Sequence, residues 1–216
     1  MNVSPIINYF ISQGVPLETT VLILMLPVIA TFIAFLRQAL GIKAFGIYTP
    51  LLVTFAFLAT NGLKYGVAIF LTVIISGLII RFVLKSFRLL YLPRVAIMLS
   101  AVSLVVLLML ALGGGLKRTG LASVSIFPIL IMITIVEKFI AVQIEKGNKT
   151  AIILAFETLV ISIFGYYLLH WASFVNLVIA YPWIVAFTLP INIFLGKWKG
   201  LRLTEYLRFR EVIKKM

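Results

Sequence analysis

The sequence predicts an all-α fold, a polytopic membrane helix bundle of about seven transmembrane helices, with the N-terminus outside and the C-terminus in the cytoplasm. Three observations predict it. Of 216 residues, 63% are hydrophobic and 12% are charged, whereas soluble domains carry roughly 25% charged residues. The hydrophobic residues form seven runs of membrane-spanning length, and most Lys and Arg residues flank those runs on one side.

The seven hydrophobic runs are each long enough to cross most of the hydrocarbon core of a bilayer, which takes about 20 helical residues. They cover residues 19–36, 45–62, 65–84, 94–113, 121–143, 150–169 and 175–195. The connections are short, so we expect consecutive helices to be antiparallel neighbours. The seventh run contains Pro182 and Pro190, and proline interrupts helical hydrogen bonding.

The distribution of Lys and Arg predicts the orientation. If the seven spans alternate in direction, sixteen of the nineteen Lys and Arg residues fall on one side, and Lys64, Lys117 and Arg118 fall on the other. Basic residues in short loops stay in the cytoplasm. The net charge of +13 therefore reflects topology, and we expect the lipid bilayer and anionic lipid, not nucleic acid, to be its partners.

Two flanking segments complete the predicted organisation. Residues 1–17 form an extracytoplasmic segment, and residues 18–196 form the seven-helix domain. Hydrophobic residues of the first segment recur at helical spacing and predict a short helix in the membrane interface, with a frayed tail as the alternative: Ile6, Ile7, Phe10 and Ile11. Residues 197–216 form a basic cytoplasmic tail.

Two carboxyl groups inside predicted spans form the candidate intramembrane polar or ion site. All six acidic residues are Glu, and only Glu137 and Glu157 lie inside spans, where an ionisable group is costly. They lie at similar depth on helices joined near Gly147. If they face each other, repulsion at low dielectric favours a shared proton or a bound cation, as in coupled transport. The alternative is a stabilising contact of each carboxylate with Arg81, Arg94, Lys138 or a hydroxyl.

The sequence contains no motif of a common enzyme or metal site. It has no Cys and one His, and it lacks Ser-His-acid, HExxH, paired-Asp and GxxxxGK[ST] patterns. We therefore predict no catalytic residue, no cofactor and no metal, with an intramembrane enzyme acting on a lipid-linked substrate as an alternative. The stretch KAFGIYTP at 43–50 is either a helix start with Tyr48 in the aromatic belt or a ligand site.

Three stretches carry a family resemblance: LRQALGIKAFGIYTP at 36–50, FPILIMITIVEKF followed by EKG at 127–147, and GLRLTEYLRFR at 200–210. They resemble the bacterial seven-transmembrane module that is usually fused behind an inactive transglutaminase-like domain. The likeness covers nearly the whole chain in the same order. It implies the same seven helices, with the transglutaminase-like domain outside the cell, before the first of them.

The resemblance also implies partners. Such modules tend to be encoded beside ATP-grasp peptide ligases, which implies a role in making or handling a peptide-like modification. The 216 residues hold no transglutaminase-like domain, so we expect any function of that domain to be either absent or supplied by another chain. Besides Glu137, the matching positions that we single out are Arg37, Gln38, Tyr48, Thr49, Pro50, Arg202, Glu205 and Arg208.

These expectations favour a multi-pass protein of the plasma or inner membrane that acts as a non-enzymatic scaffold or sensor. It would couple an external transglutaminase-like partner to a cytoplasmic ATP-grasp-type ligase through its basic loops and tail. The alternative is a small proton- or cation-coupled transporter that uses Glu137 and Glu157.

Overall fold

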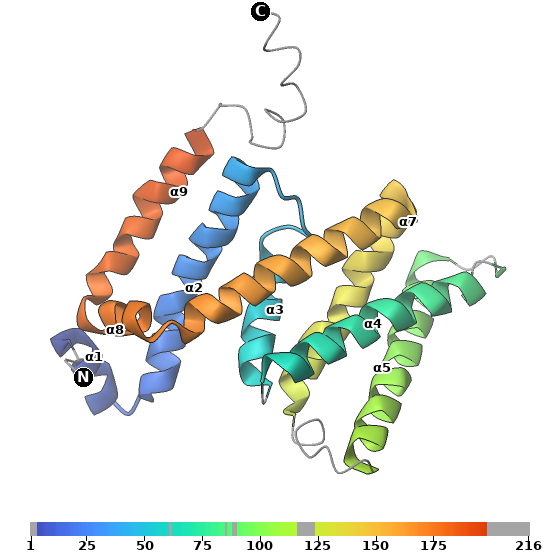
Figure 1. The fold of residues 1–216 in the computed structure, drawn as a ribbon, viewed down its shortest axis with the longest axis horizontal. Coiled ribbons are helices and arrows are strands. Elements are labelled where there is room, and N and C mark those ends of the chain that lie inside the picture. Colours follow the sequence, from blue (N-terminus) through green and yellow to red (C-terminus); the bar gives the residue numbers. More distant parts are fainter. Residues whose placement is uncertain (1–3, 61, 85, 88–89, 116–123, 198–216) are drawn as a thin grey trace, which may run out of the picture. The chain divides into compact units, whose positions relative to one another are not determined.

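The computed structural model describes residues 4–60, 62–84, 86–87, 90–115 and 124–197 (Figure 1). These residues form helices joined by short connections, and no β-strand occurs among them. The chain forms two compact units, which are described separately below. The central unit is Ala44–Tyr166, and the terminal unit combines Met1–Lys43 with Tyr167–Met216. The predicted all-α class is confirmed.

In the terminal unit, α2 (Leu17–Phe35) contacts five other described helical elements. These elements are α1 (Pro5–Ser12), the π-helical η1 (Leu36–Leu40), α8 (Ala172–Ala180), the 3₁₀ helix η2 (Pro182–Phe187) and α9 (Thr188–Lys197). The side chains that fill the core are at most 1% exposed: Ile7, Met25, Ile29, Ile33 and Val178.

The predicted N-terminal helix is present as α1. The Ser4 hydroxyl caps it by accepting a hydrogen bond from the Ile7 backbone N–H at 3.3 Å, and Pro5 occupies its first turn, as is usual at helix starts. Ile7 is buried, whereas Ile6 and Phe10 are exposed. The helix is therefore confirmed, and its place in the membrane interface stays a prediction.

Two predicted runs differ from the helices observed. The seventh run is not one helix, because α8 ends before Pro182 and the chain bends by 99° between the α8 and α9 segments. Pro182 has no N–H to continue the α8 hydrogen bonds, and it disfavours a helical conformation at Tyr181. The second run is shorter than predicted: α3 covers only Tyr48–Ala59, since Ala44 (φ 43°) and Gly46 (φ 88°) hold the preceding backbone in a turn.

The central unit contains α3, α4 (Leu63–Leu84), α5 (Tyr91–Gly115) and α7 (Ile126–His170) up to Tyr166. The helix labelled α7 is two helices joined at Gly147, whose φ of 83° and ψ of 168° are not helical. In Figure 1 the two halves run back from a common apex. The predicted hairpin about Gly147 is confirmed.

The described helices account for the seven predicted segments in order. Four are individually long and hydrophobic enough to cross a membrane: Leu17–Leu40, Leu63–Leu84, Tyr91–Gly113 and Ile126–His170. The bent α8–α9 pair is a fifth candidate span. The division of α7 at Gly147 and the short α3 supply the remaining two segments.

Aromatic rings and one glycine set the packing of the central unit. Phe57 contacts Phe70 edge-to-face with ring centroids 6.4 Å apart, and Phe45 contacts Phe139 in the same way at 6.2 Å. Such pairs stabilise beyond the area they bury. At Gly77 of α4, an added Cβ would lie 3.8 Å from Phe139, so this glycine brings α4 close to the first half of α7.

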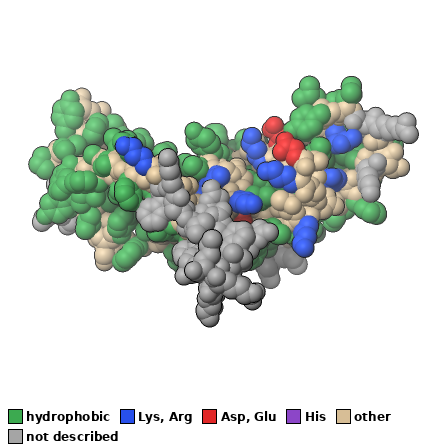
Figure 2. All heavy atoms as spheres, turned by 90° about the horizontal axis from the view of Figure 1, so that it is seen from above, with side chains coloured by type: hydrophobic (Ala, Val, Ile, Leu, Met, Phe, Trp, Pro, Cys, Tyr) green, Lys and Arg blue, Asp and Glu red, His purple; other side chains and the backbone are tan. Residues whose placement is uncertain are grey.

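Four of the six described basic side chains of the central unit lie at one end. The last turn of α4, the first turn of α5 and the apex of α7 carry them: Arg81, Arg94, Lys146 and Lys149. Figure 2, viewed from above, shows Lys and Arg side chains lying among hydrophobic and acidic ones. Lys64 lies at the other end of α4. This distribution is the one on which the predicted cytoplasmic side depends.

Candidate functional site

The structure places the predicted site residues on three elements. Arg37 and Gln38 lie in η1 of the terminal unit. In the central unit, the start of α3 carries Tyr48, Thr49 and Pro50, and the two halves of α7 carry Glu137 and Glu157. Lys197, the first residue of the predicted basic tail, ends α9, whereas the rest of that tail, with Arg202, Glu205 and Arg208, lies outside the described residues.

The backbone just before α3 is held against the second half of α7. The Ala44 N–H donates to the Glu157 carboxylate at 2.8 Å, and the Phe45 N–H donates to Thr158 Oγ1 at 3.1 Å. Ala44 has a left-handed φ of 43°, a conformation that costs energy for any residue with a side chain. The two acceptors on α7 satisfy consecutive amides of this turn and so stabilise it.

Hydroxyl groups continue this contact one turn further along both helices. The Pro50 carbonyl accepts hydrogen bonds from Ser162 Oγ at 3.0 Å and from Thr54 Oγ1 at 2.8 Å. Thr54 and Ser162 are fully buried. We call the set formed by Ala44, Phe45, Pro50, Thr54, Glu157, Thr158 and Ser162 the polar seam. The family-like stretch 43–50 thus takes part in helix packing.

Gly165 lets the two helices approach at the end of the polar seam. A Cβ built on it would lie 2.6 Å from Thr54 Oγ1 and 2.9 Å from Thr54 Cγ2, closer than atoms can come. The residues Thr158, Ser162 and Gly165 were not singled out from the sequence. Their spacing of four and then three residues places them on one helix face, and this is the signal that predicts a close polar contact.

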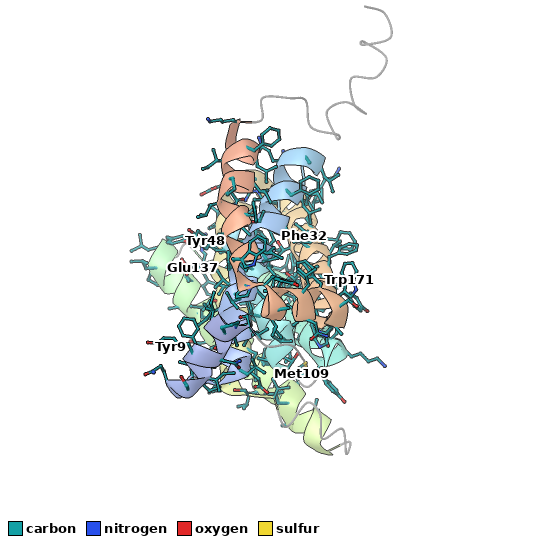
Figure 3. All side chains as sticks on the ribbon, turned by 90° about the vertical axis from the view of Figure 1, so that its left-hand side faces the viewer. Tyr9, Phe32, Tyr48, Met109, Glu137 and Trp171 are labelled. Atoms are coloured by element: carbon teal, nitrogen blue, oxygen red, sulfur yellow. The ribbon has the colours of Figure 1, made fainter. Side chains whose placement is uncertain are left out.

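The two carboxyl groups have different surroundings. Glu157 is half-buried, and its partner Ala44 is a backbone amide that was not expected from the sequence. Glu137 is exposed between the buried Val136 and Phe139. Tyr48, which is 80% exposed, is the other exposed residue among the described candidate positions, and Figure 3 labels both. In the described part of the chain, no group of three or more His, Cys, Asp or Glu residues is placed to hold a metal ion.

Arg37 and Gln38 lie in a π-helical turn that ends at Gly41, where φ is 82°. Such turns are rare and frequently occur at functional sites. Gln38 borders a groove of about 510 Å³ in the terminal unit, and the other residues that line it are hydrophobic: Phe35, Ala39, Phe187, Pro190, Ile191, Phe194 and Leu195. This lining suits acyl chains of lipid more than a polar solute.

Comparison with known families decides what kind of module this is. Residues 4–213 match the model of a family described as seven transmembrane helices usually fused to an inactive transglutaminase. The chain belongs to this family. The match confirms the resemblance found in the three sequence stretches and, together with the hydrophobic helices, a multi-pass membrane helix bundle. No curated protein and no solved structure matches the chain.

Membership in the seven-helix family puts the polar seam inside the family module, because the matched range covers both sides of it. The seam joins a turn and helix near residue 50 to a helix near residue 160, which are separated by more than a hundred residues in the chain. It holds α3 and the turn before it against the second half of α7.

Proposed function

We propose that this seven-helix module is a non-enzymatic scaffold or sensor of the plasma or inner membrane. It works with an extracytoplasmic transglutaminase-like partner and a cytoplasmic ATP-grasp-type ligase in making or handling a peptide-like modification. Support for the first partner comes from the family, whose members usually carry an inactive transglutaminase. A fused domain without catalytic activity can still bind a ligand or partner, and the membrane module that carries it holds that domain at the membrane surface.

The non-enzymatic part of the proposal rests on one observation: polar groups of the central unit are hydrogen-bonded to the backbone of a neighbouring segment. The carboxylate of Glu157 accepts a backbone N–H at 2.8 Å, and the Ser162 hydroxyl donates to the Pro50 carbonyl at 3.0 Å. Buried polar groups are stable when they are hydrogen-bonded in this way. They stabilise a rigid bundle, which is what a platform for two partners requires.

The basic end of the central unit is the surface we assign to the ligase partner. Lys146 and Lys149 are exposed at the apex of α7, on the side that we predict to be cytoplasmic. Exposed charges of one sign favour association with a surface of the opposite sign and accelerate it. The ligase is therefore expected to bring an acidic patch to this apex.

Co-purification of the full-length chain from its native membrane tests the proposal. With a mild detergent and a C-terminal tag, we expect to recover both a transglutaminase-like protein and an ATP-grasp ligase. Charge reversal by Lys146→Glu with Lys149→Glu should release the ligase and retain the transglutaminase-like partner. Lys64→Glu, at the other end of α4, serves as the control for the ligase. Absence of both partners from the unmodified protein would contradict the proposal.

A further inference from the structure

Arg81 lies in the last turn of α4, and one of its guanidinium N–H groups faces α7. Its Nη2 donates to the backbone carbonyl of Gln143 at 3.3 Å. Its Nη1 is buried and has no hydrogen-bond partner. Among the described residues, no carboxylate forms an ion pair with Arg81. One face of this guanidinium is therefore held in place while the other still needs an acceptor.

Gln143, whose backbone carbonyl accepts the bond from Arg81, carries a second unsatisfied group in its side chain. Its side chain is 1% exposed, and neither Nε2 nor Oε1 makes a hydrogen bond. It continues the buried face of α7 one turn after Phe139 and Ile140, where a hydrophobic residue would be expected. A buried amide without partners costs about 1–3 kcal/mol, so its presence needs an explanation other than the stability of the free chain.

Arg94 brings a second positive charge to this position. It lies in the first turn of α5, is half-buried, and its charge acts on the guanidinium of Arg81. Two guanidinium groups near each other repel, and the repulsion is relieved when an anion lies between them. The adjoining ends of α4 and α5 thus bring two cations to the part of α7 that carries Gln143, whose buried side-chain amide is unpartnered.

We propose that Arg81, Arg94 and Gln143 form a binding site for a phosphate group at the basic end of the central unit. Guanidinium groups bind phosphate through paired N–H donors, and the Gln143 amide supplies a further N–H. Basic groups at the ends of membrane helices suit anionic lipid headgroups. The phosphate belongs either to such a headgroup or to a soluble phosphate, and the chemistry is the same for both. The inference does not depend on the proposed scaffold role.

Native mass spectrometry of the full-length chain tests the site, with phosphatidylglycerol as the probe. Zwitterionic phosphatidylcholine is the reference, because its choline cation is repelled by the two arginines. We expect Arg81→Gln and Arg94→Gln each to weaken phosphatidylglycerol binding about tenfold or more, since a charge-assisted hydrogen bond contributes about 1.5–3 kcal/mol. Lys64→Gln, an exposed position at the other end of α4, should bind as the wild type does.

Gln143→Met separates binding from folding. The change keeps a similar volume and removes the unpartnered amide, so we expect the lipid-free protein to be as stable as the wild type or more so. Binding of phosphatidylglycerol should nevertheless weaken. A variant that is stable and binds as tightly as the wild type would remove Gln143 from the site.

Thermal unfolding with inorganic phosphate identifies the source of the phosphate group. If inorganic phosphate, and not chloride at equal ionic strength, stabilises the wild type but not Arg81→Gln, the site takes soluble phosphate. If only phosphatidylglycerol distinguishes the two proteins, the site takes a lipid headgroup. Equal responses of wild type and Arg81→Gln to both probes would overturn the proposal.

Discussion

Glu157 accepts a hydrogen bond from the Ala44 backbone N–H, and that amide lies on a residue only 4% exposed. The fold therefore depends on an acceptor atom at this position. We expect Glu157→Ala to lower the free energy of unfolding by about 1–3 kcal/mol, because it leaves a buried N–H unsatisfied. Glu157→Gln keeps an acceptor oxygen and should cost less than the alanine variant. Chemical denaturation in detergent measures both, and equal stability of wild type and Glu157→Ala would contradict this role.

Gly165 tests the close approach of α3 and α7. We expect Gly165→Ala to destabilise the protein by about 1–3 kcal/mol, because its Cβ would overlap the Thr54 side chain. Gly196→Ala is the matched control, since nothing lies within 4 Å of the added carbon, and alanine is the better helix former. Thermal unfolding of both variants measures the difference. If the double variant Gly165→Ala, Thr54→Ala is no more stable than expected from adding the two single changes, Thr54 is not the obstacle.

At the residue scale, the sequence identifies polar side chains in unusual positions better than it predicts the groups that they contact. Glu157 stands out because an acid inside a hydrophobic run is costly. Its partner is a backbone amide 113 residues away, and every residue has such an amide, so no side-chain pattern indicates it. Gln143 did not stand out at all, because its burial follows from the packing of α7.

Within the terminal unit, a side-chain hydrogen bond joins α2 and α9. Asn192 Nδ2 donates to Thr31 Oγ1 at 2.8 Å, and Thr31 Oγ1 in turn donates to the Pro27 carbonyl at 2.8 Å. We expect Thr31→Val and Asn192→Leu to show a coupling of about 0.6 kcal/mol in a double-mutant cycle, the size typical of hydrogen bonds between membrane helices. Thermal unfolding of the four proteins measures it, and strictly additive effects would mean that the bond does not stabilise the pair.

At the element scale, hydropathy predicts that a segment exists better than it predicts where the helix begins and ends. The seven runs all correspond to helical segments, because backbone groups in a hydrocarbon environment must satisfy each other. Two boundaries were wrong for local reasons. Pro182 ends α8 inside the seventh run, and the turn at Ala44 and Gly46 delays α3. Both involve hydrophobic or small residues that a hydropathy average does not distinguish from helix.

At the scale of the whole molecule, the strongest results are the all-α membrane fold and the membership in the seven-helix family. A chain that is 63% hydrophobic can hide its surface only in a membrane, and its match over residues 4–213 to the seven-helix family agrees with that reasoning. The phosphate site and the ligase surface both use the basic end of the central unit, so both depend on which side of the membrane that end faces.

Cysteine accessibility in intact cells tests that orientation most directly, because the natural chain contains no Cys. Single variants Gln13→Cys, after α1, and Asn148→Cys, at the apex of α7, both replace exposed residues. With a membrane-impermeant maleimide, we expect Gln13→Cys to be labelled in intact cells and Asn148→Cys to be labelled only after permeabilisation. Labelling of Asn148→Cys in intact cells would contradict the account.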